Sequence, residues 1–62
     1  MKYSELKKLL KHHGCYKSNE GANHEIWFSP ITSNTFPVSR HNTQDVKKGM
    51  QNTILKQAGI VL

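Results

Sequence analysis

The sequence predicts one α+β domain in which a helix, three strands and a second helix follow one another. Three observations predict it. Apolar residues recur at helical spacing near both ends, the middle of the chain is rich in strand-forming residues, and Gly, Pro and Asn separate the strand segments. We expect a three-stranded antiparallel sheet with both helices on one face, in a single domain over residues 1–62 with a thin core.

The first helix is predicted from the apolar spacing near the N-terminus. Its apolar face, at positions i, i+3, i+4 and i+7, consists of Leu6, Leu9, Leu10 and His13. The opposite face carries cations that we expect in water: Lys7, Lys8 and Lys11. Ser4 is the expected N-cap because its hydroxyl accepts a hydrogen bond from a first-turn amide, and Gly14 is the expected stop.

The three strands are predicted at residues 15–20, 24–28 and 35–39. Tyr16 is the best core candidate of the first, and the turn at 21–23 follows because Gly and Asn tolerate hairpin angles. Residues 29–34 form the next turn. Pro37 confines the third strand to a sheet edge or an irregular end, since proline donates no hydrogen bond.

Alternation along the second strand places His24, Ile26 and Phe28 on one face and Trp27 on the other. If the His24 face is open, Trp27 belongs to the core, and Ile26 and Phe28 are partly exposed. The reverse parity would turn His24 toward the helices. On the third strand the expected core residues are Phe36 and Val38.

The last third of the chain begins with a polar segment, 43–48, in which Asp45 and Val46 start a helical turn. Gly49 is expected to interrupt it, and the second helix is expected at 50–58. The apolar repeat of this helix consists of Met50, Ile54, Leu55 and Ala58. Gly59 is the expected stop, after which residues 60–62 fold back onto the core.

Composition limits the partners and the compartment. Nine Lys and Arg against four Asp and Glu give a net charge of +5, which attracts phosphate backbones, although a membrane surface or an acidic protein would also attract it. The single cysteine, Cys15, forms no internal disulfide, and we assign it no role. No apolar run approaches the roughly 20 residues that span a bilayer. We expect a cytoplasmic protein without a membrane partner.

The residues that remain for chemistry are histidines and cations. The sequence has no Cys/His cluster with zinc spacing, no phosphate-binding glycine loop and no paired carboxylates, so we expect neither a metal nor a cofactor. RNA carries its own nucleophile, the 2′-hydroxyl. Near neutral pH, histidine can take the proton of this hydroxyl or give a proton to the leaving 5′-oxygen. Lys or Arg can offset the negative charge on the phosphate.

The stretch Gly21-Ala22-Asn23-His24, together with residues 4–10, 38–41 and 54–60, resembles the HicA-type toxins, the messenger-RNA-cleaving halves of bacterial toxin–antitoxin pairs. The resemblance implies a double-stranded-RNA-binding-like fold and RNA cleavage by His24 as general acid or base. It also implies a type II toxin–antitoxin system in which a HicB-type antitoxin neutralises this chain.

The candidate site therefore has His24 as the catalytic residue, supported by the turn residues Gly21 and Asn23. The candidate RNA-binding residues are Lys17, Arg40, His41, Lys47 and Lys48. The candidate antitoxin-binding residues are Ile26 and Phe28. Two alternatives remain open: a non-catalytic double-stranded-RNA-binding module, and a protein-interaction domain whose charge fits an acidic partner.

Overall fold

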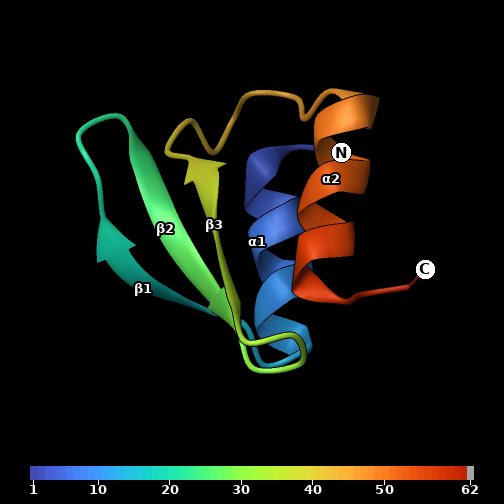
Figure 1. Cartoon of the computed structure of the whole chain (residues 1–62). Helices are drawn as coiled ribbons and strands as arrows, with labels where there is room; N and C mark the ends of the chain where they lie inside the picture. The colour runs from blue at the N-terminus through green and yellow to red at the C-terminus, as the bar shows by residue number, and fades with distance from the viewer. Residues whose placement is uncertain (62) are drawn as a thin grey trace.

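The computed structural model describes residues 1–61 and confirms the predicted order of elements. These are α1 (Tyr3–His12), β1 (Tyr16–Glu20), β2 (His24–Ser29), β3 (Asn34–Ser39) and α2 (Lys48–Ala58). The strands pair antiparallel in the order β1-β2-β3, and both helices lie on the same side of the sheet (Figure 1). The architecture is consistent with a double-stranded-RNA-binding-like fold.

The core lies between the sheet and the two helices. Trp27 is 2% exposed, which confirms the predicted parity of β2, while Ile26 and Phe28 are half-buried on the outer face. The buried apolar residues of this core are Leu6, Leu10, Cys15, Trp27, Phe36, Val38, Val46, Ile54, Leu55, Ala58 and Ile60. Pro37 lies on β3, an edge strand, where a missing N–H leaves no gap in a ladder.

Helix α1 begins earlier than predicted, and Ser4 is not its N-cap. Lys2 occupies that position, and its backbone N–H donates to Glu5 Oε1 at 2.9 Å. The amides of Tyr3 and Ser4 donate to the carbonyl oxygens of residues 44 and 42, each at 3.0 Å. The loop before α2 therefore satisfies the first two amides of a helix that begins before Ser4, so Ser4 lies inside the first turn and not at the cap position. His13, expected on the apolar face, is exposed.

Tyr16 is not a core residue. Its side chain is 52% exposed, and its ring lies 5.5 Å from that of Phe28 on the outer face of the sheet. The preceding residue, Cys15, is buried instead. Because side chains alternate along an extended chain, a buried Cys15 turns Tyr16 outward, and the small thiol rather than the large ring fills the core position.

Helix α2 also differs from the prediction at its start. It begins at Lys48 and includes Gly49, which does not interrupt it. Asp45 and Val46 form no helical turn; Asp45 bridges to Lys2, and Val46 N–H donates to the Met1 carbonyl at 2.8 Å. Paired with the N-terminal segment, these residues are held extended rather than helical.

The end of the chain confirms part of the prediction. Gly59 stops α2 in the left-handed conformation, at φ 76°, and Ile60 packs into the core. Val61 does not fold back, since it is 93% exposed, and Leu62 lies outside the described residues. Over residues 1–61, no helix has the length and apolar character needed to cross a membrane.

Candidate active site

His24 lies at one end of the sheet, and its side chain is exposed. It is the first residue of β2 and pairs with Ser39, the last residue of β3. The turn before it closes through the Gly21 N–H, which donates to the His24 carbonyl at 2.8 Å. A Cβ at Gly21 would lie 3.2 Å from that oxygen, so glycine lets the turn approach β2 closely. Asn23, the other turn residue, is exposed.

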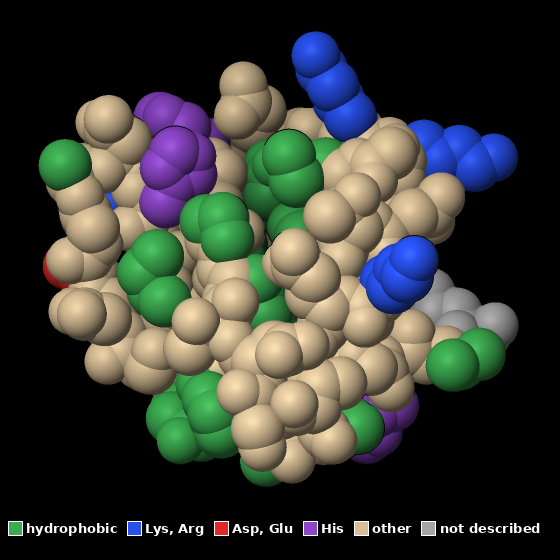
Figure 2. Space-filling model, viewed as in Figure 1, with side chains coloured by type: hydrophobic (Ala, Val, Ile, Leu, Met, Phe, Trp, Pro, Cys, Tyr) green, Lys and Arg blue, Asp and Glu red, His purple; other side chains and the backbone are tan. Residues whose placement is uncertain are grey.

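A pocket of about 80 Å³ opens beside His24. Its other lining residues come from three elements: Tyr3 of α1, Pro37 and Ser39 of β3, and Met50 and Ile54 of α2. In Figure 2, histidine side chains border a group of hydrophobic side chains, and most of the side chains in the colour of the cations project from the side of the molecule where α2 lies. The first turns of both helices therefore meet the end of the sheet at His24.

Sequence reasoning missed these five pocket residues as parts of the site. For Pro37 and Ser39 a signal existed, because they alternate with the predicted core residues Phe36 and Val38 and so share the outer face with His24. For Tyr3 and Met50 no local signal existed, since only the packing of the helices brings them to this strand end.

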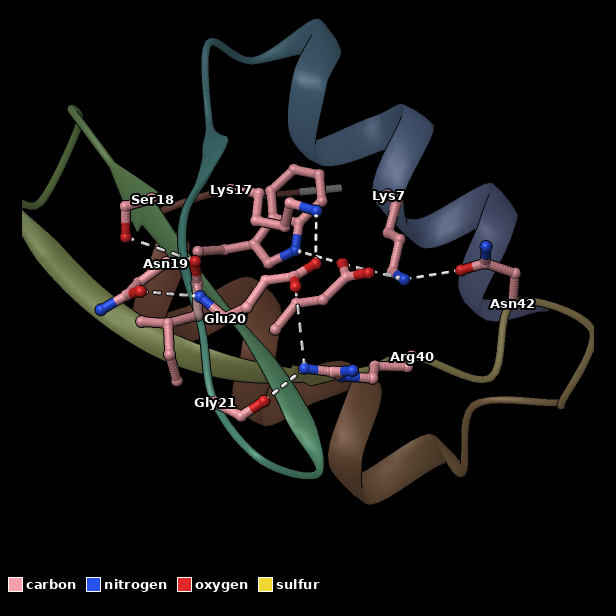
Figure 3. Close-up of polar contacts among 11 residues, drawn as sticks. Lys7, Lys17, Ser18, Asn19, Glu20, Gly21, Arg40 and Asn42 are labelled. Carbon is pink, nitrogen blue, oxygen red and sulfur yellow. Dashed lines mark hydrogen bonds and ion pairs between the residues drawn. The ribbon is translucent and has the colours of Figure 1, made fainter.

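Arg40 holds the turn against the end of β3. Its guanidinium donates to the Gly21 carbonyl oxygen, and its Nη2 lies 3.9 Å from Glu20 Oε2 (Figure 3). This predicted RNA-binding residue is therefore already engaged with the turn that precedes His24. The positive charge of Arg40 lies close to the turn before His24, but the Glu20 carboxylate partly neutralises it.

Lys17 is engaged with the same carboxylate. Its Nζ lies 2.9 Å from Glu20 Oε1, and this hydrogen bond and the opposite charge raise the pKa of Lys17. The same hydrogen bond and charge, with that of Arg40 in addition, lower the pKa of Glu20. Lys17 pairs with Trp27 across the strands, so it lies on the parity of the core-facing residues, not on that of His24.

Lys47 and Lys48 are exposed at the start of α2, where Lys47 is the N-cap and Lys48 the first helical residue, and only Gly49 separates Lys48 from Met50 of the pocket. Neither forms an ion pair with any residue in 1–61. The first turn of α2 has no acidic residue, so its own side chains supply no negative charge at the positive end of the helix dipole. His41, exposed, donates its backbone N–H to Ser39 Oγ at 3.1 Å.

Next to His24, a partly buried polar network connects β2 to α1. Lys7, expected in water, is buried; its Nζ lies 3.0 Å from Glu25 Oε1 and donates to Asn42 Oδ1 at 2.6 Å (Figure 3). Trp27 Nε1 donates to the same Glu25 oxygen at 3.0 Å. The strand residue next to His24 is therefore tied to the helix and to the loop after β3.

The network sets the ionisation of Glu25. Burial opposes the charged form, but hydrogen bonds from Trp27 and Lys7, with the charge of Lys7, outweigh it, and the pKa of Glu25 lies below its ordinary value. Glu20 and Glu25 face one another across β1 and β2, and different cations pair with them: Lys17 and Arg40 with Glu20, and Lys7 with Glu25. Among residues 1–61, no three His, Cys, Asp or Glu side chains gather closely enough to hold a metal ion.

Comparison with known proteins adds the family. Residues 3–60 match the family model described as the HicA toxin of bacterial toxin-antitoxin systems, which covers both helices and the whole sheet. No curated protein and no solved structure matches the chain. The chain belongs to the HicA toxin family, the toxin component of type II toxin–antitoxin systems, whose members are mRNA interferases.

Proposed function

We propose that this protein is an endoribonuclease that cleaves messenger RNA without a metal ion, with His24 as general acid or base. The observation that carries the proposal is the position of His24, exposed at a strand end and lining a pocket between the first turns of two helices. A general acid or base must reach the reacting group within hydrogen-bond distance, and this imidazole is open to a ligand as large as RNA.

The reaction needs one nucleophile, which the substrate supplies. The 2′-oxygen attacks the adjacent phosphorus, the new O–P bond forms as the bond from phosphorus to the 5′-oxygen breaks, and the fragments end in a 2′,3′-cyclic phosphate and a 5′-hydroxyl. One proton leaves the 2′-hydroxyl and one reaches the 5′-oxygen. His24 transfers one of these protons near neutral pH, and water transfers the other.

The cations that best fit the phosphate are Lys47 and Lys48. They stand at the N-terminal end of α2, where a helix favours negative charge. His41 lies next to the pocket residue Ser39, to which its backbone N–H donates a hydrogen bond. Arg40 and Lys17 share their charge with Glu20, so they contribute mainly by holding the turn before His24.

A HicB-type antitoxin is the proposed protein partner, and the outer face of the sheet is its proposed docking surface. Ile26 and Phe28 are half-buried there, beside the exposed Tyr16 ring, and they share this face with His24. An antitoxin that covers this apolar strip would also cover the imidazole.

The test is the nature of the cut. Purified protein is incubated with a short RNA that contains its cleavage site, and the fragment ends are identified by mass. We expect a 2′,3′-cyclic phosphate and a 5′-hydroxyl, no effect of EDTA, and no cleavage when the ribose at the cut is 2′-deoxy. RNA binding without cleavage would favour the non-catalytic module, and fragments ending in 5′-phosphate would contradict the mechanism.

A further inference from the structure

The pocket beside His24 is apolar where the fold does not require it. Met50 is 47% exposed at the rim and Pro37 is also exposed, whereas Ile54 forms a buried floor. An exposed methionine supports a helix no better than lysine or glutamine does. Three apolar side chains around one hollow therefore fit a ligand with an apolar face.

Two hydroxyl groups complete the lining. Ser39 Oγ already accepts the N–H of His41 at 3.1 Å, so its own hydrogen is left to donate to an acceptor in the pocket. Tyr3 adds a half-buried phenol. Apolar walls with a hydroxyl donor are complementary to a planar heterocycle, which has apolar faces and a hydrogen-bonding edge.

We propose that this pocket, which we call the base pocket (Tyr3, Pro37, Ser39, Met50 and Ile54), binds one unstacked nucleobase of the RNA. The base belongs to a nucleotide next to the phosphate on which His24 acts, since His24 lines the same pocket. The inference rests on the proposed function and adds a determinant of where the RNA is cut.

The chemistry of cleavage supplies the reason for such a pocket. The 2′-oxygen must come into line with the bond that breaks, which a nucleotide stacked in a helix does not allow, so one base must leave its neighbours. An unstacked base is stabilised by aromatic and apolar side chains and is read through hydrogen bonds to its edge. At about 80 Å³ the pocket is much smaller than sites that enclose a whole ligand, so it accepts the edge of one base at most and excludes a base pair.

The Ser39 hydroxyl gives the pocket a preference. A base edge that turns a carbonyl oxygen or an unprotonated ring nitrogen toward Ser39 satisfies this donor, whereas an edge that turns an amino group toward it must use the remaining lone pair of Oγ instead. Sites that hydrogen-bond their ligand discriminate against analogues that leave the group unpaired. The choice of cleavage site is therefore expected to depend on the identity of the base at one position next to the cut.

The experiment compares wild type, Met50→Ala and Ile31→Ala on a short single-stranded RNA and on copies with an abasic ribonucleotide on either side of the cut. Ile31 is a matched control, because it is 54% exposed but lies in the turn between β2 and β3, at the other end of the sheet (Figure 1). Circular dichroism and urea midpoints confirm that each variant is folded.

We expect Met50→Ala to lower kcat/KM by roughly ten-fold, as loss of one base contact does, and one abasic position to cost the wild type a similar factor. The two losses do not multiply, because each removes the same contact. Ile31→Ala cleaves as wild type does, and Ser39→Ala flattens the base preference across a random RNA pool.

The proposal of a base pocket would be overturned if the losses of kcat/KM from Met50→Ala and from the abasic position multiplied fully. It would also be overturned if Met50→Ala had the kcat/KM of the wild type. Unchanged cleavage by Met50→Ala combined with lost neutralisation by antitoxin would overturn it too, and would assign the pocket to that protein. If wild type cleaves no RNA, the proposed function fails by itself. The base pocket is then supported by tighter binding of the intact RNA than of an abasic one, a difference absent in Met50→Ala, and overturned by equal binding.

Discussion

Replacing Lys7 by methionine tests the buried ion pair that holds α1 against the strand of His24. The side chains of Lys7 and Glu25 are 10% and 15% exposed, and their charged atoms lie 3.0 Å apart. Methionine keeps an unbranched apolar stem and removes the charge and the donors. Glu25 then retains the hydrogen bond from Trp27, while Asn42 Oδ1 loses its donor at 2.6 Å.

The expected cost follows from this geometry. Removing one partner of a fully buried pair costs about 3–5 kcal/mol. Because both side chains keep some contact with water and Trp27 still bonds Glu25, we expect about 2–3 kcal/mol at pH 7. A domain of this length has a total stability of roughly 3–9 kcal/mol. The variant should therefore lose a large share of it, with a fall in Tm on the order of 10–20 °C.

The stability difference between wild type and Lys7→Met should depend on pH, in a direction set by the pKa of Glu25. In wild type the pKa of Glu25 lies below its ordinary value of 4.5, so the stabilisation is complete above that pH and is lost as the pH falls through the folded-state pKa. In Lys7→Met the hydrogen bond and charge of Lys7 are gone while burial remains, so the pKa of Glu25 rises. The stability difference between the two proteins should shrink below about pH 4.5.

The assay is urea unfolding at pH 7 and at pH 3, followed by the fluorescence of Trp27, the only tryptophan. Lys8→Met is the matched control, since Lys8 is the exposed neighbour on α1, and its change should stay within about 0.5 kcal/mol. The reasoning is refuted if Lys7→Met unfolds like this control, or if its deficit is the same at both pH values.

Three further substitutions test how the elements end and pack. Gly49→Ala should stabilise by about 0.5–1 kcal/mol, because the new Cβ meets no atom within 4 Å and glycine weakens a helix; an unchanged or lower thermal midpoint would contradict this. Gly59→Ala should destabilise by about 1–3 kcal/mol, since φ is 76° and the Cβ would lie 2.7 Å from Thr32 Cγ2; a wild-type urea midpoint would count against it. Ser29→Ala should cost about 1–3 kcal/mol, because the buried hydroxyl donates to the Ala58 carbonyl at 2.6 Å; chemical denaturation decides, with a change below about 0.5 kcal/mol as the contrary result.

Periodicity predicted the features that depend on one element at a time. The alternation from His24 to Phe28 placed Trp27 in the core, and Gly59 marked the end of α2. These predictions hold because side-chain direction along a strand and the left-handed conformation at a helix end are properties of the local backbone.

The errors arise where distant segments decide the outcome. Lys7 was expected in water because it lies opposite the apolar face of the helix, but it pairs with Glu25, which is remote in the sequence. Ser4 was expected as the cap because of its hydroxyl, but a loop that is also remote in the sequence binds the first amides of α1. Tyr16 was expected inside because large aromatic residues favour cores, but the register buried Cys15. In the candidate site, His24 could be found from its own stretch, whereas Tyr3 and Met50 join it only through tertiary packing.

The central claim is that one exposed imidazole at the start of β2 transfers a proton during RNA cleavage, and the cleavage rate of His24→Ala tests it most directly. His12→Ala is the control, because His12 is also exposed but ends α1. We predict that His24→Ala keeps the wild-type urea midpoint and loses roughly 10²- to 10⁴-fold in rate, while His12→Ala cleaves normally. A folded His24→Ala protein that cleaves RNA at the wild-type rate would contradict the claim.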